Sequence, residues 1–296
     1  MTALAEGALS RAGTFRTRLA FGSLLVAGVV LVVWVDATLA PVWATGAVLA
    51  GLALTAQFEF YAMLRRGGFP VATRFGLLAG AYFLATRFLP AFGLGTAGGA
   101  YDAGAHLAVV TVAILVRGVL RRRVEGAPVE AATTLLGVVA VPFLLGYAVE
   151  LRVSSERGLG LLVFLVALAK TCDSCAYFGG VVLGKRRLIP EVSPKKTRVG
   201  AACGLLGSVG LAALLGAKDL AGGLGLTEAI GAGILLGVAA QFADLAESLL
   251  KRGCGVKDSA STIPVLGGAF DLVDSLLFAA PALRLYVSAL AALRAG

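Results

Sequence analysis

The sequence predicts an all-α polytopic membrane protein with about nine transmembrane helices and a cytoplasmic N-terminus. The first reason is composition, because 58% of the residues are hydrophobic and 15% are charged, whereas a soluble domain carries about a quarter charged residues. The second is that apolar runs long enough to cross a bilayer recur along the whole chain. The third is the distribution of basic residues, which agrees with a single orientation.

Each predicted span is a run of roughly 20 mainly apolar residues, the length that a transmembrane helix needs. The first run contains no charge and has no clear small-residue cleavage site, which argues against a cleavable signal. Arg87 interrupts the third run and Asp173 the sixth. The nine predicted spans are 19–35, 42–63, 75–95, 103–120, 131–148, 158–180, 200–217, 226–250 and 269–290.

Basic clusters determine the predicted orientation. With nine spans and the N-terminus inside, the clusters precede span 1 and follow spans 2, 4, 6 and 8, so all of them are cytoplasmic. The net charge of +9 comes from these clusters, which would meet anionic lipid at the cytoplasmic helix ends. A nucleic-acid partner is therefore not needed to explain the charge. The C-terminus is then outside, and the charged loops 184–198 and 251–268 lie on one face. The clusters are Arg11/Arg16/Arg18, Arg65/Arg66, Arg121/Arg122/Arg123, 185-KRR-187 with 195-KK-196, and Lys251/Arg252/Lys257.

A polar stripe runs along the end of the predicted helix 226–250. A carboxylate at mid-bilayer costs roughly 2.5–3.5 kcal/mol on insertion scales, and less near the interface, so Asp244 requires compensation. A helix end with a surface ion pair between Glu247 and Lys251 is the simpler explanation, but it leaves Asp244 unexplained. The residues that share this helix face are Asp244, Glu247, Ser248, Lys251 and Arg252.

The following predicted helix presents a second pair of acids. Asp271 and Asp274 are three residues apart, so both face one way, near the positive end of the helix dipole. Clustered carboxylates without His or Cys suit a hard cation such as Mg²⁺. Neighbouring lysines and arginine suit phosphates. Together with the membrane location, this pattern indicates phosphoryl or nucleotidyl transfer on a lipid.

The earlier charged segment, 170–197, agrees with this interpretation. It contains the intramembrane Asp173, a flexible Gly179-Gly180, and a basic loop in which 193-SPKK-196 can start a turn or helix that holds a polyphosphate. The 172-CDSC-175 pair has no second CxxC partner, so helix packing is expected for its thiols. The single histidine, His106, is expected at the membrane interface.

These residues resemble the signature of the phosphatidate cytidylyltransferases, also called CDP-diacylglycerol synthases, which runs S-x-x-K-R-x4-K-D, then Pro, then H-G-G-x-x-D-R-x-D. The segments 173-DSCAYFGG-180, GK at 184–185 and 193-SPKKT-197 resemble a second family segment, and 59-EFY-61 is also similar. The resemblance covers about residues 130–285. The residues in the places of the signature are Ser248, Lys251, Arg252, Lys257, Asp258, Pro264, Gly267, Gly268, Asp271 and Asp274.

The resemblance implies that CTP and phosphatidate give CDP-diacylglycerol and pyrophosphate, at the cytoplasmic side of the cell membrane, for phospholipid synthesis. It implies Mg²⁺ on Asp244 and Asp271, with a second cation such as K⁺ as an option. The implied catalytic residues are Lys251, Arg252, Lys257, Asp258 and Asp274. The implied substrate-binding residues are Asp173, Lys185, Ser193, Lys195, Lys196, Thr197 and Ser248. Membrane lipids are the expected surroundings, and a homodimer is an option for the assembly. Residues 1–130 form N-terminal transmembrane helices and 131–296 the transmembrane catalytic region of one unit.

Three positions depart from the family pattern: Leu266 replaces the signature His, Leu272 an Arg, and Val199 a Glu. We expect these positions to be secondary, because the carboxylates and lysines are intact; a catalytically inactive relative is one alternative. A CTP-dependent polyprenol or phytol kinase is another. A transporter with intramembrane acids is a third, but it would more often show two related halves with broken helices.

Overall fold

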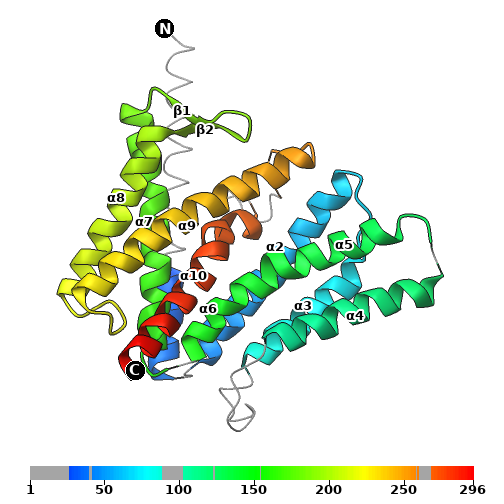
Figure 1. Cartoon of the computed structure of the whole chain (residues 1–296), viewed down its shortest axis with the longest axis horizontal. Coiled ribbons are helices and arrows are strands. Elements are labelled where there is room, and N and C mark those ends of the chain that lie inside the picture. The colour runs from blue at the N-terminus through cyan, green and yellow to red at the C-terminus, as the bar shows by residue number, and fades with distance from the viewer. Residues whose placement is uncertain are drawn as a thin grey trace.

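The computed structural model describes residues 27–39, 42–88, 103–122, 124–153, 155–257, 259 and 268–296. Within these ranges the chain is almost entirely helical, so the all-α prediction is confirmed, with one small two-stranded hairpin as an addition (Figure 1). After a first helix, Ala27–Thr38, the elements are α2 (Trp43–Arg66), α3 (Thr73–Phe88), α4 (Ala103–Arg121), α5 (Ala127–Val138), η2 (Val139–Phe143), α6 (Leu144–Val153), α7 (Gly158–Leu183), β1 (Arg187–Ile189), β2 (Ser193–Thr197), α8 (Arg198–Ala217), α9 (Leu226–Gly253) and α10 (Ala269–Ala295).

Seven helices of the described chain are long and apolar enough to cross a membrane. They are α2, α4, the continuous run Ala127–Val153, α7, α8, α9 and α10. Helices also occupy the described parts of the first and third predicted spans, but Ala27–Thr38 is short and α3 has 16 residues. Nine spans and a cytoplasmic N-terminus therefore remain predictions.

The run Ala127–Val153 stays continuous although it contains a proline. Pro142 has no backbone N–H to donate, and the chain passes through the π-helical turn η2 at this point. The Pro142 side chain packs toward α3, where a Cβ added at Gly80 would lie 2.8 Å from it. A glycine on α3 therefore lets the two helices approach.

Helices α7, α8, α9 and α10 alternate in direction and form one side of the molecule (Figure 1). Small residues let them come close, as in many membrane proteins. A Cβ added at Gly233 on α9 would lie 2.6 Å from the Cβ of Ala212 on α8. On the other side, α2 and α6 pack against α10, and the buried residues of these three helices belong to one hydrophobic core.

Arg87 is tolerated in the apolar helix α3 because it is buried and paired. The residue is 1% exposed, and its guanidinium forms an ion pair with Glu150 on α6. Arg284 on α10 binds the other oxygen of Glu150 at 2.8 Å. The ring of Tyr147 lies 4.6 Å from the guanidinium carbon. This network joins α3, α6 and α10, which is the usual way in which an intramembrane charge is compensated.

We predict that Gly137→Ala destabilises the protein, because a Cβ there would lie 2.1 Å from Cε1 of the fully buried Tyr61. Overpacking of this kind costs about 1–3 kcal/mol. Gly118→Ala on α4 is the matched control, since nothing lies within 4 Å of its added Cβ, and alanine favours a helix by up to about 1 kcal/mol. Unfolding in detergent measures both; equal stabilities would contradict this packing.

We also predict that a reporter fused after Gly296 is outside, whereas reporters near Arg121 and Lys195 are cytoplasmic. The hairpin β1–β2 and the C-terminus lie at opposite ends of the bundle (Figure 1). The basic loops should face the cytoplasm by the positive-inside rule. Accessibility of the three fusions in intact cells tests this, and an outside position for Lys195 would contradict the orientation.

Candidate functional site

The carboxylates of α9 and α10 converge where the two helices pack together. Asp244, Glu247 and Asp274 each offer an oxygen, and these oxygens lie within 4.8 Å of one another. We call these three residues the acidic cluster. The three carboxylates are close enough together to share one metal ion. The structure thus brings together acids that lie up to 30 residues apart in the sequence.

Asp271, the second predicted metal ligand, lies beside the cluster in a network of its own. Its Oδ1 accepts hydrogen bonds from Lys251 Nζ at 2.7 Å and from Ser259 Oγ at 2.7 Å. Its Oδ2 accepts the backbone N–H of Gly268 at 3.1 Å, which caps the first turn of α10. Lys251 also lies 2.6 Å from Glu247 Oε1, so one ammonium group connects α9 to α10.

Two more lysines complete the charge pattern. Lys196, on β2, places Nζ 2.6 Å from Asp244 Oδ2. Lys170, on α7, lies 3.4 Å from Asp173 and 3.9 Å from Asp274, and donates to Ser275 Oγ at 2.9 Å. The prediction did not assign a role to Lys170. The signal was its position in an apolar run, three residues before Asp173.

One explanation left open for Glu247 was a surface ion pair with Lys251 at a helix end, and the surface position is wrong. The pair with Lys251 exists, but Glu247 is 4% exposed. It is buried because α10 packs over this part of α9 and brings Asp271 and Asp274 against it. Glu247 is therefore part of the acidic cluster.

The donor set fits a hard divalent cation. Five carboxyl groups (Asp173, Asp244, Glu247, Asp271 and Asp274) are connected to three lysines, so the acidic side chains outnumber the lysines by two. Uncompensated charge is expensive near a membrane. Carboxylate oxygens without thiol or imidazole are the ligands that Mg²⁺ prefers.

The hairpin separates the two adjacent lysines of the SPKKT segment. Ser193, Lys195 and Lys196 lie on β2, but Lys195 is exposed whereas Lys196 is half-buried against Asp244. The strands pair antiparallel, with Arg187 opposite Thr197. Thr197 caps α8 by accepting the N–H of Gly200 at 3.1 Å. The segment predicted as a turn or helix start is therefore a strand followed by a helix.

Most of the remaining predicted residues that the structure describes are exposed. Lys185, Arg252 and Lys257 are exposed, and Ser248 is half-buried on α9. Asp258, Pro264, Leu266 and Gly267 lie outside the described residues. Of the family departures, Val199 is 37% exposed, and Leu272 contributes its backbone carbonyl, which accepts from Lys170 Nζ at 3.0 Å. That contact does not depend on the side chain at 272.

The four cysteines are free. Cys172 is buried, and a Cβ added at Gly204 on α8 would lie 3.2 Å from its sulfur. Cys175 packs in the same way against Gly207. His106 lies beside Tyr82 at 2.9 Å, between α4 and α3. These contacts agree with helix packing for the thiols.

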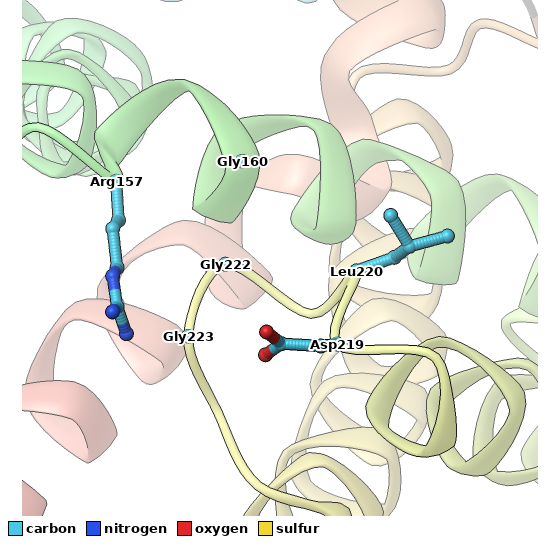
Figure 2. A pocket seen from close by; sticks show the side chains of 6 residues that line it. All are labelled: Arg157, Gly160, Asp219, Leu220, Gly222 and Gly223. Carbon is cyan, nitrogen blue, oxygen red and sulfur yellow. The ribbon is translucent and has the colours of Figure 1, made fainter.

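A separate cavity of about 320 Å³ lies between the start of α7 and the loop after α8. Figure 2 shows the side chains of Arg157 and Asp219 at this hollow, and both residues are exposed. None of the predicted site residues that the structure describes lines it. The candidate site is therefore the acidic cluster and its lysines.

With the site described, comparison with known proteins identifies the family. Residues 16–290 match the Cytidylyltransferase family, and the chain therefore belongs to this family. It is 41% identical over 121 residues to phosphatidate cytidylyltransferase 5, chloroplastic, of Arabidopsis thaliana. It is 35% identical over 154 residues to the phosphatidate cytidylyltransferase of Bacillus subtilis. It is also 36% identical over 126 residues to the uncharacterized protein YnbB of Escherichia coli.

These three matches cover 40%, 51% and 43% of this chain, in that order. They cover 30%, 56% and 42% of the relatives, so the similarity extends over roughly a third to a half of each. The resemblance to the phosphatidate cytidylyltransferases is confirmed by these comparisons.

We predict that the double substitution Cys172→Ala and Cys175→Ala leaves Mn²⁺ binding unchanged. The thiols pack against glycines of α8, so the loss should be one of packing, of about 1 kcal/mol in stability. Titration calorimetry with Mn²⁺ measures the affinity, with Asp244→Asn as the variant that should lose it. A folded double variant that no longer binds Mn²⁺ would indicate thiol ligation instead.

Proposed function

We propose that the protein is a phosphatidate cytidylyltransferase that converts CTP and phosphatidate into CDP-diacylglycerol and pyrophosphate at the cytoplasmic face of the membrane. The observation that carries this proposal is the acidic cluster, surrounded by lysines, at one end of a bundle of membrane helices. The names of the relatives support the choice of substrates.

The proposed reaction needs charge neutralisation more than proton transfer. An oxygen of the lipid phosphate, already anionic at neutral pH, attacks the α-phosphorus of CTP. The bond from that phosphorus to the bridging oxygen breaks, and pyrophosphate leaves with the electron pair. The site must bring two anions together and compensate the charge that develops on pyrophosphate. No strong general base is required.

The acids would hold the metal ion. We retain Asp244 and Asp271 as the proposed ligands, and the structure adds Glu247 and Asp274 as neighbouring oxygen donors. When bound, Mg²⁺ would neutralise part of the triphosphate charge and orient it; a second cation such as K⁺ is compatible with the number of acids. Asp173, half-buried on α7 and linked to Asp274 through Lys170, would support this arrangement.

The basic residues would bind phosphates. Lys196 and Lys251 contact the acids directly, so each can turn a proton donor toward a phosphate next to the cluster. The exposed Lys185, Lys195, Arg252 and Lys257 would attract CTP from solution. Ser193, Thr197, Ser248 and Asp258 complete the proposed set. We propose a homodimer as the assembly of the protein.

The proposal is tested by product analysis. Purified protein in lipid nanodiscs receives Mg²⁺, CTP labelled in the cytidine, and phosphatidate. The expected product is a labelled lipid that comigrates with CDP-diacylglycerol, with one pyrophosphate released per lipid. A CTP-dependent kinase would instead phosphorylate an added polyprenol and leave the label out of the lipid. Absence of labelled lipid with folded protein would contradict the proposal.

We predict that Asp244→Asn and Asp271→Asn each lower turnover by at least about a hundredfold, or roughly 2.7 kcal/mol of transition-state stabilisation. Each substitution keeps the shape of the side chain and removes its charge. Because Glu247 is buried in the cluster, Glu247→Gln should also lower turnover, by at least about tenfold.

The matched control for these variants is Asp219→Asn. Asp219 is exposed, lies in the separate cavity, and has a φ of 54°, which asparagine adopts readily. Its turnover should stay within about twofold of the parent, since it lies outside the acidic cluster. Near-parent turnover in both Asp244→Asn and Asp271→Asn, with the fold retained, would eliminate the proposed metal ligands.

A further inference from the structure

We propose that Glu59, on α2, is a positioning residue that fixes the first turn of α10 and thereby the acids that α10 brings to the site. The proposal rests on the cation site proposed above. It concerns a residue from the N-terminal helices, outside the region 131–296 that was predicted to hold the catalytic groups.

Glu59 caps the N-terminus of another helix. It is 2% exposed, and its Oε2 accepts the backbone N–H of Phe270 at 2.9 Å. The first N–H groups of a helix have no partner within the helix, and a carboxylate there also interacts favourably with the helix dipole. The rings of Phe60 and Phe270 pack beside this contact, with centroids 5.3 Å apart. Helix α2 therefore holds the start of α10 by a polar and an apolar contact.

The glycine before α10 makes room for this carboxylate. A Cβ added at Gly268 would lie 2.3 Å from Glu59 Oε2 and 2.4 Å from Ser259 Oγ. The φ of Gly268 is −93°, a value that any residue can adopt, so the backbone conformation does not require glycine. The lack of space for a Cβ atom favours glycine at this position. The last glycine of the family-like signature is thus explained by its contact with Glu59 and Ser259.

Helix α2 contacts the site at a second point. Arg66 donates to the backbone carbonyl of Ser259 at 3.1 Å, and the hydroxyl of Ser259 donates to Asp271. A Cβ added at Gly67 would lie 2.9 Å from Cα of Cys254, so the end of α2 also lies against the turn after α9. Helix α2 is therefore fixed to the end of α9 and to the beginning of α10.

The second oxygen of Glu59 adds to the cost of burying this residue, a cost that Gln57 on the same helix shares. Oε1 is buried and has no hydrogen-bond partner among the described residues. A buried carboxylate oxygen without a partner costs free energy that an apolar residue would avoid. Retaining Glu59 is explained if the position of α10 matters to the site.

A small shift of this turn would reach the cation site. Asp271 is three residues into α10 and Asp274 lies one turn further. Metal and substrate sites need their ligands held within about 0.5 Å, and loss of a residue that orients a ligand typically lowers metal affinity by about 10–100-fold. Glu59 thus acts on the site through Asp271 and Asp274.

The experiment compares Glu59→Leu, Glu59→Gln and Gln57→Leu in the full chain. Glutamine can still accept the N–H of Phe270, whereas leucine cannot. Gln57 is the matched control, because it is a buried polar residue of α2 whose amide binds Tyr61 and Gly76, away from α10. Titration calorimetry gives Mn²⁺ affinity, and hydrogen exchange reports the amides of residues 268–275.

We expect Glu59→Leu to weaken Mn²⁺ binding at least tenfold and to speed exchange at the start of α10. Glu59→Gln should stay within threefold, and Gln57→Leu should lower unfolding temperature with less than a twofold change in affinity. Gly268→Ala should reproduce the effect of Glu59→Leu. Unchanged Mn²⁺ affinity and exchange in Glu59→Leu would overturn the proposal, as would an equal loss in Gln57→Leu or in Glu59→Gln.

The outcome also separates this inference from the proposed function. If the parent binds no Mn²⁺ at the acidic cluster, the cation site is wrong, and with it the role of Glu59 toward that site. If the parent binds Mn²⁺ through Asp244 and the Glu59 variants bind it equally well, the cation site remains and only the positioning role is lost.

Discussion

The contact on which the site depends is Lys251, whose ammonium lies between Glu247 of its own helix and Asp271 of α10. A buried charge without a partner is costly, so this lysine compensates two carboxylates at once and joins two helices that must otherwise repel each other there. Lys196 compensates Asp244, and Lys170 lies between Asp173 and Asp274. The acids can gather in a membrane protein because these three lysines reach them from different elements.

The helices α7 to α10 deliver the charged groups, and the N-terminal helices hold them in place. Glu59 and Arg66 bind the segment around the start of α10. Further along α10, Arg284 binds Glu150, which also pairs with Arg87. Helix α10 is thus attached at its beginning to α2 and further along to α6, which in turn is paired with α3.

The helical spans could be predicted because a chain in lipid must satisfy its backbone within each segment, so apolar length alone identifies helices. Asp244 and Asp274 could be predicted as members of a candidate site because an acid within an apolar run needs a reason to be there. Lys170 was marked only by its place three residues before Asp173, and its contact with Ser275, 105 residues away, could not be predicted. Glu59 could not be connected to the site, since its partner Phe270 lies 211 residues away and no periodicity reports such a contact. The burial of Glu247 likewise depends on α10. The strand at 193–197 was missed because its sequence resembles a turn.

We propose that α9 and α10 together form one divalent-cation site. The most direct measurement is anomalous diffraction from crystals of the protein soaked in Mn²⁺, with data collected on both sides of the manganese edge. We expect an anomalous peak within about 2.5 Å of carboxylate oxygens from both helices, including Asp244. The absence of a peak at saturating Mn²⁺, or a peak bound by residues of neither helix, would contradict it.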